Sequence, residues 1–201
     1  VIHLEEKTLY GYAWNKVYRV QSLRESGVVF EKITLIEDIK FNVSYFDSVC
    51  SMNVLNTTPY HYLKRIDGSL TNKFLPDYFT LNAERVFLVL EQYKNWGMCT
   101  EEVRRILANI YVRYLFSALQ RNCDKRSDMN HAQRKEWLKQ QYKTPLCKEL
   151  LSAVQASGTL FKCMAKAFCA GNIPLCLMIA RSIFAVKSAF PTVFSTLKQQ
   201  H

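Results

Sequence analysis

The stretch Leu35-Ile36-Glu37-Asp38-Ile39-Lys40-Phe41-Asn42 joins two adjacent carboxylates to a run of residues with helical periodicity. Apolar residues continue beyond it at the three- and four-residue spacing of one helix face, which predicts a helix over residues 37–52. Glu37 and Asp38 then lie in its first turn, where the helix dipole favours negative charge. A carboxylate held there can act as a general base toward a hydroxyl group. Acidic residues are also common capping residues at helix starts, so the pair alone leaves both interpretations open.

Upstream of this pair, residues 14–26 have the apolar spacing of a second helix, and Gly27 is a plausible C-terminal stop. The ring of Trp14 can stack on a sugar, and Asn15 and Lys16 can form hydrogen bonds with its hydroxyl groups. The alternative is an ordinary helix start whose tryptophan is a buried anchor.

Downstream, residues 54–66 are rich in β-branched and aromatic side chains and predict a strand, and residues 8–13 predict a second, shorter one. The longer strand leads into a polar loop. Within this region His61, Arg65 and Ser69 are residue types suited to binding a diphosphate. An exposed polar turn that binds nothing accounts for the same residues.

From about Pro76 onward the pattern is helical. The predicted segments are 78–96, 100–122, 132–141, 145–156, 159–170, 174–188 and 191–200. Their short connections suggest an antiparallel helical bundle. The predicted fold is therefore mainly α, within the α+β class, with one or two short strands and a C-terminal helical bundle. We expect two domains, residues 1–75 and 76–201.

The positive charge of the chain is concentrated at its end. The net charge is +10, and residues 125–201 hold 12 Lys and Arg against 3 Asp and Glu. Such a field attracts phosphate groups, and basic amphipathic helices can lie on an anionic membrane surface. The same helices can instead form their own core or pack against a second copy of the chain in a homo-oligomer. No nucleic-acid-binding motif accompanies the charge, so we expect no nucleic-acid partner.

Cysteine usage and hydropathy predict a cytoplasmic protein. The seven cysteines are an odd number, form no Cys-x-x-Cys pair and have mostly apolar neighbours, which suggests reduced thiols. The most apolar run, residues 173–180, is far shorter than the roughly 20 residues that cross a bilayer. The chain begins with Val1 rather than Met, and we expect a preceding part of the protein.

Three segments, in this order, resemble bacterial family 2 glycosyltransferases. Residues 12–19 look like the WNKLYRR segment of that family, and residues 30–41 resemble its F-x-x-x-x-x-x-E-D-x-x-F segment. Residues 60–72 are similar to its YYYRxxxGSLT segment. The three matches lie within about residues 9–74, which are about a third of the chain.

This resemblance implies a GT-A fold, of which this chain would be the acceptor-side remnant and the nucleotide-binding half would precede it. It implies inverting transfer of a sugar from a nucleotide sugar to a glycan or lipid-linked glycan acceptor, in cell-surface polysaccharide synthesis at the inner face of the plasma membrane. The roles it implies are catalysis by Asp38 with support from Glu37, acceptor binding by Trp14, Asn15 and Lys16, and donor-phosphate binding by His61, Arg65 and Ser69.

The complete enzyme is expected to use a divalent metal, Mg or Mn, whose ligands lie mostly outside this chain. This part alone would then be inactive. The alternative function is a non-enzymatic basic helical module that binds a membrane surface or a protein partner.

Overall fold

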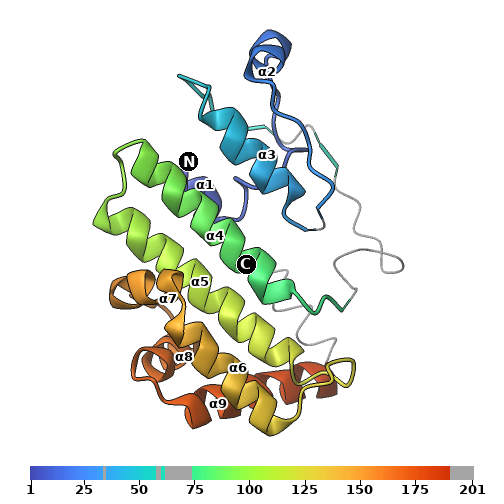
Figure 1. Cartoon of the computed structure of the whole chain (residues 1–201), viewed down its shortest axis with the longest axis vertical. Helices are drawn as coiled ribbons and strands as arrows, with labels where there is room; N and C mark the ends of the chain where they lie inside the picture. The colour runs from blue at the N-terminus through green and yellow to red at the C-terminus, as the bar shows by residue number, and fades with distance from the viewer. Residues whose placement is uncertain (34, 58–59, 62–73, 191–201) are drawn as a thin grey trace. The chain divides into compact units, whose positions relative to one another are not determined.

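A computed structural model describes residues 1–33, 35–57, 60–61 and 74–190, and all regular secondary structure in these ranges is helical (Figure 1). The elements are α1 (Ile2–Glu6), α2 (Val20–Ser26), α3 (Glu37–Phe46), α4 (Tyr78–Asn95), α5 (Glu101–Arg121), α6 (His131–Lys143), α7 (Pro145–Leu150), the 3₁₀ turn η2 (Leu151–Ala153), α8 (Thr159–Cys169) and α9 (Ile173–Ala189). The chain divides into two compact units, residues 1–107 and 108–201, and α5 runs across the boundary.

The mainly α prediction is confirmed, but the predicted strands are wrong for the residues that the structure describes. Residues 8–13 turn back toward α1, because the backbone N–H groups of Leu9 and Tyr10 both donate to Leu4 O, at 2.7 and 3.2 Å. Residues 54–57 are exposed and pair with no strand among the described residues. Strand propensity produces a strand only where a neighbouring segment supplies hydrogen bonds and packing. A GT-A remnant with strands is therefore not supported by this fold.

Two helix predictions in the first unit need correction at their ends. Helix α2 begins at Val20 rather than at residue 14, because the side chains of Asn15 and Lys16 form hydrogen bonds with backbone carbonyl oxygens of the same loop. Such local bonds compete with helix formation. Its predicted stop is confirmed, since Gly27 has a left-handed φ of 64°. Helix α3 ends at Phe46 rather than near residue 52, and the short helix α1 was not predicted.

The core of the first unit lies between α3 and α4, which run side by side (Figure 1). The buried apolar side chains on these two helices are Ile39, Phe41, Val43, Tyr45, Phe46, Phe79, Val86, Val89, Leu90 and Tyr93. Burial of one such side chain is worth roughly 1.5–3 kcal/mol. The helical face predicted from residue 37 onward is therefore the face that carries the core.

A buried ion pair joins α1 to α4. The guanidinium of Arg85 donates from Nε and Nη2 to the two carboxylate oxygens of Glu5, both at 2.7 Å, and Glu5 is only 1% exposed. Gly11 passes close to the same guanidinium, since a Cβ on residue 11 would lie 2.8 Å from Arg85 Nη2. A side chain at position 11 would therefore displace the ion pair.

The second unit is built from the later part of α5 and the helices that follow it. Its predicted segments 100–122, 132–141, 159–170 and 174–188 are confirmed as helices, with ends within a few residues of those expected. The predicted helix 145–156 is shorter, since α7 ends at Leu150 and the 3₁₀ turn η2 at Ala153. Residues 191–200 lie outside the described residues. Asn130 forms a capping box with Gln133 at the start of α6. Tyr142 of α6 stacks on Phe168 of α8 with ring centroids 4.7 Å apart and donates its hydroxyl to Phe168 O.

None of the helices described here is both long enough and apolar enough to cross a membrane.

Replacing Arg85 with Met should lower the free energy of unfolding by about 3–5 kcal/mol, because the Glu5 carboxylate would stay buried without its partner. Urea unfolding monitored by circular dichroism measures this. The control is Lys94→Met, which removes a half-exposed ion pair with Glu91 and should cost less than about 1 kcal/mol. If the two variants lost a similar amount of unfolding free energy, the buried ion pair would not be a major source of stability.

Candidate functional site

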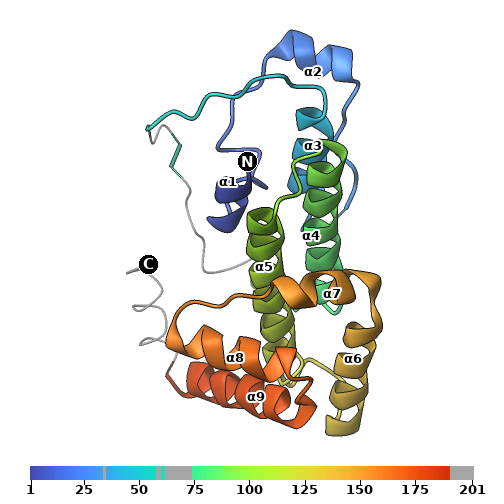
Figure 2. The ribbon, with the colours of Figure 1, turned by 90° about the vertical axis from the view of Figure 1, so that its left-hand side faces the viewer.

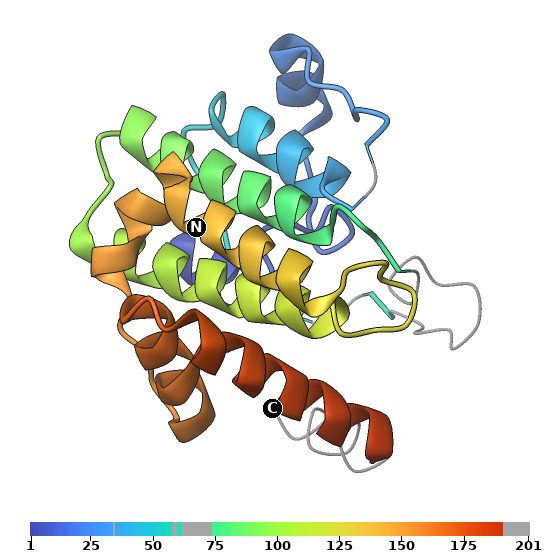
Figure 3. The same ribbon diagram turned by 60° about the horizontal axis from the view of Figure 1, so that its bottom comes forward.

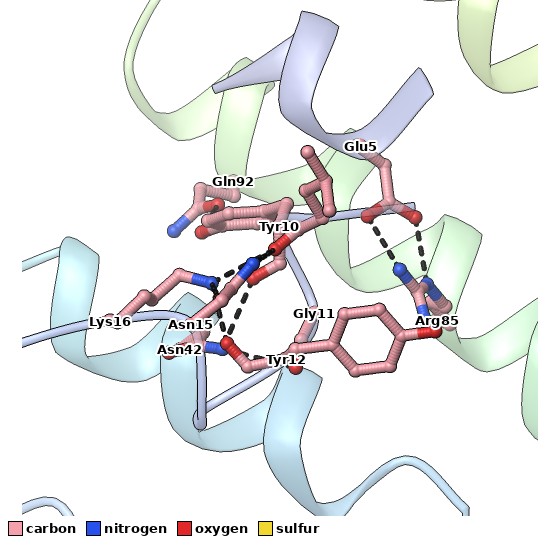
Figure 4. Close-up of polar contacts among 10 residues, drawn as sticks. Glu5, Tyr10, Gly11, Tyr12, Asn15, Lys16, Asn42, Arg85 and Gln92 are labelled. Atoms are coloured by element: carbon pink, nitrogen blue, oxygen red, sulfur yellow. Dashed lines mark hydrogen bonds and ion pairs between the residues drawn. The ribbon is translucent and has the colours of Figure 1, made fainter. Parts of the chain in front are cut away.

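The loop of residues 9–18 contacts α3, and the buried side chain of Asn42 binds it there (Figure 4). Asn42 of α3 donates from Nδ2 to Tyr10 O and to Gly11 O, both at 3.1 Å. Its Oδ1 accepts a hydrogen bond from the Tyr18 hydroxyl at 2.7 Å. A single amide therefore binds both ends of the loop.

The side chains of Tyr10 and Tyr18 donate hydrogen bonds from hydroxyl groups that stay protonated. Burial raises the pKa of Tyr18, and the nearby Asp38 carboxylate raises it further. Burial likewise raises the pKa of Tyr10, whose hydroxyl donates to Gln92 Oε1 at 2.7 Å. Gln92 in turn donates to Val43 O at 2.8 Å. The loop, α3 and α4 are thus joined by buried hydrogen bonds whose donors keep their protons.

Asp38 lies one helical turn before Asn42, so the two side chains share a face of α3. Asp38 Oδ2 accepts a hydrogen bond from the backbone N–H of Ala13 at 3.2 Å, and the side chain is half-buried. The predicted base is therefore fixed against the residue that precedes Trp14. Glu37 differs, because its Oε2 is buried with no hydrogen-bond partner in the part of the chain that the structure describes.

The side chain of Lys16 forms hydrogen bonds with other residues of the same loop. Its ammonium donates to Tyr12 O at 2.6 Å, to Leu9 O at 3.0 Å and to Asn15 Oδ1 at 2.9 Å (Figure 4). Burial lowers the pKa of Lys16 to about 8, against the opposing effect of the Asp38 carboxylate. Asn15 Nδ2 also donates to Leu9 O, at 2.9 Å. In this structure the polar groups of Asn15 and Lys16 are directed at the loop backbone, and their predicted role in acceptor binding stays a prediction.

Trp14 belongs to a partly exposed aromatic cluster. Its ring stacks on Tyr60 with centroids 5.1 Å apart and an interplanar angle of 25°, and the Tyr12 ring lies at 4.9 Å. Tyr60 is 53% exposed and Tyr12 is 38% exposed. His61 directly follows Tyr60 in the chain and is exposed. The stacking of Tyr60 on Trp14 therefore brings this part of the chain to the loop that contacts Asp38. The other two predicted donor-phosphate residues, Arg65 and Ser69, lie outside the described residues.

Four residues of this site were not predicted from the sequence, namely Tyr12, Tyr18, Asn42 and Tyr60. For Asn42 a signal exists, because a polar residue four positions after Asp38 interrupts an otherwise apolar helix face. Nothing in the local sequence indicates the contact of Trp14 with Tyr60, which lies 46 residues further along the chain.

The described residues hold no group of three or more His, Cys, Asp or Glu side chains that could bind a metal ion. They therefore do not by themselves fit the divalent metal predicted for the complete enzyme. That metal stays a prediction about residues elsewhere.

Comparisons with protein-family models, with curated proteins and with solved structures found no match to this chain.

Replacing Asn42 with Leu should lower the free energy of unfolding by about 3 kcal/mol, because two buried carbonyl oxygens and the Tyr18 hydroxyl lose their partner. Denaturant unfolding measures the loss. The exposed residue Ser44 on the same helix is the control, and Ser44→Ala should change stability by no more than about 0.5 kcal/mol. A loss for Asn42→Leu as small as that of the control would contradict the network.

The buried amine of Lys16 should make stability depend on pH. Between pH 8 and the ordinary lysine pKa of about 10.4 the unfolded chain keeps this proton while the folded chain releases it, so stability rises with pH in this window. Relative to the Lys16→Met variant, the wild-type chain should therefore gain stability from pH 7.5 to about pH 10. A difference between the two proteins that stays constant across the window would contradict the burial of the ammonium.

Proposed function

We propose that this chain is the acceptor-binding part of an inverting glycosyltransferase, in which Asp38 is the general base for a glycan or lipid-linked glycan acceptor. The observation that carries the proposal is the hydrogen bond from Ala13 N to Asp38 Oδ2, 25 positions apart in the sequence. It supports the proposal because it joins the two segments whose resemblance to family 2 enzymes suggested catalysis and acceptor binding.

The proposed step is a direct displacement at the anomeric carbon. The acceptor hydroxyl gives its proton to Asp38, and its oxygen forms a bond to that carbon as the bond to the nucleoside diphosphate breaks. The leaving group takes the bonding electron pair, and the configuration of the sugar inverts. The Ala13 N–H occupies one lone pair of Oδ2 and orients the carboxylate, while a carboxylate retains further acceptor positions for the hydroxyl.

The neighbourhood of Asp38 suits this role. Asp38 lies in the first turn of α3, at the positive end of the helix dipole, where negative charge is favourable. The Lys16 ammonium also interacts electrostatically with this carboxylate, although its hydrogen bonds go to the loop. The half-buried position leaves part of the side chain accessible to a hydroxyl group.

The aromatic cluster of Tyr12, Trp14 and Tyr60 supports acceptor binding. The C–H groups of a sugar ring pack well on the face of an aromatic ring, and these rings are partly exposed beside the loop that contacts Asp38. Donor-phosphate binding by His61, Arg65 and Ser69 belongs to the same proposal.

Replacing Asp38 with Asn in the complete enzyme should lower kcat by about 10²–10⁴-fold, because the amide cannot take the hydroxyl proton. The rate is measured as nucleoside diphosphate released in the presence of the acceptor. The exposed carboxylate Asp77, which caps no backbone group with its side chain, is the control, and Asp77→Asn should leave kcat unchanged. A folded Asp38→Asn enzyme with near-normal turnover would end the assignment.

Replacing Trp14 with Ala should raise the KM for the acceptor by about three- to tenfold, the value of one aromatic stacking contact. The KM for the nucleotide sugar should not change. Initial rates at varied acceptor and at varied donor distinguish the two constants. A change confined to the donor KM would place the cluster at the donor side instead.

A further inference from the structure

The end of the chain combines basic and apolar side chains without any acidic residue. No Asp or Glu occurs after Glu149, so residues 150–201 carry only positive charges. Within this part α8 and α9 contact each other and are joined by a short turn, and we call the two helices the α8–α9 hairpin, residues 159–190 (Figure 2). Figure 3, with the bottom of Figure 1 brought forward, shows α9 along its length.

Helix α8 has two opposite faces. Met164, Ala165 and Phe168 are buried on one of them. Lys162 and Lys166 are exposed on the other, one helical turn apart. The two ammonium groups therefore lie on the same side of the helix, away from the core of their unit.

Helix α9 adds apolar side chains to a basic surface. Its inner residues Cys176 and Ala180 are buried in the contacts with α6 and α8. Met178 and Val186 are 59% and 55% exposed, and Arg181 is exposed between them along the helix. Two further large apolar side chains are exposed, Leu160 in the first turn of α8 and Phe190 just after the end of α9.

Helix α6 shows that this combination is not general to the unit. It also exposes lysines, but Lys139 pairs with Glu136 at 3.5 Å, and the helix has no large exposed apolar residue. Isolated exposed apolar side chains are ordinary on protein surfaces, whereas here several of them occur on the same two neighbouring helices as the exposed cations.

We propose that the α8–α9 hairpin docks on an anionic lipid surface. Lys162, Lys166 and Arg181 contact the phosphate groups of the lipid heads, and the exposed apolar side chains enter the boundary of the acyl chains. Charge complementarity selects this partner, because no carboxylate in the hairpin opposes a negative surface. Basic helices with apolar side chains bind in the plane of the interface without crossing the membrane. This docking is independent of the proposed sugar transfer.

The test uses the whole chain of 201 residues and liposome flotation. The vesicles contain phosphatidylcholine alone or phosphatidylcholine mixed with phosphatidylglycerol. The chain should float with the anionic vesicles at least about tenfold more strongly than with neutral ones, and raising the salt concentration should release it. Equal binding to both vesicles, or no binding to either, would overturn the proposal.

A charge-matched pair of variants then locates the surface. The hairpin variant is Lys162→Glu, Lys166→Glu and Arg181→Glu, and the control on α6 is Lys135→Glu, Lys139→Glu and Lys143→Glu. The hairpin variant should lose vesicle binding and the control should keep most of it. Equal losses would mean that net charge alone drives binding, and the assignment to the hairpin would be wrong. Circular dichroism verifies that both variants are folded.

An apolar variant tests the second half of the surface. Leu160→Ser with Met178→Ser keeps the charge and removes two exposed side chains, and it should weaken vesicle binding several-fold. Unchanged vesicle binding would overturn entry of these residues into the membrane. Light scattering without vesicles addresses a second copy of the chain as the occupant. A dimer that this variant converts to a monomer would replace the lipid proposal with self-association.

Discussion

The geometry of the candidate site depends on the side chain of Asn42. A buried amide has two donor hydrogens and an acceptor oxygen that must all be satisfied, and here the two ends of the loop of residues 9–18 satisfy them. Since Asn42 and Asp38 lie one turn apart on α3, the loop that Asn42 binds also contacts Asp38. The position of the proposed base is therefore a consequence of a structural hydrogen bond rather than of any contact with substrate.

A second constraint acts on the same loop from the opposite side. The ion pair of Glu5 with Arg85 joins α1 to α4, and the loop passes it at Gly11, where a Cβ atom would lie 2.8 Å from Arg85 Nη2 and force the guanidinium to shift. The loop is thus bound to α3 through Asn42 and confined at Gly11 by the guanidinium. Lys16 completes its shape by binding carbonyl oxygens within the loop. The contacts that stabilise the unit thus also fix the carboxylate on which the proposed function depends.

The sequence predicted the helices after residue 76 because their periodicity, caps and short connections are all local signals. It also placed Glu37 and Asp38 correctly in the first turn of a helix. It failed for residues 14–19, where hydrogen bonds from Lys16 to the loop outweigh the helical spacing. The buried network could not be predicted, since its partners are distant in the chain, as with Tyr10 and Gln92, which are 82 positions apart. The contact of Trp14 with Tyr60 could not be predicted either, because these two residues are also distant in the chain.

The two units carry different chemistry. The first places a carboxylate, an ammonium and an aromatic cluster on one loop and helix, while the second exposes cations beside apolar side chains on α8 and α9. If the acceptor is linked to a lipid, docking of the second unit on a membrane would increase the local concentration of acceptor for the first. Sugar transfer and membrane docking would then serve one reaction, although each stands on its own observations.

The most direct measurement is a crystal structure of the complete enzyme with an acceptor and an unreactive donor analogue. The account predicts that the attacking hydroxyl lies about 2.6–3.2 Å from a carboxylate oxygen of Asp38, on the side of the loop that carries Trp14. An acceptor hydroxyl whose nearest carboxylate belongs to another residue, with Asp38 bound only to Ala13, would contradict it.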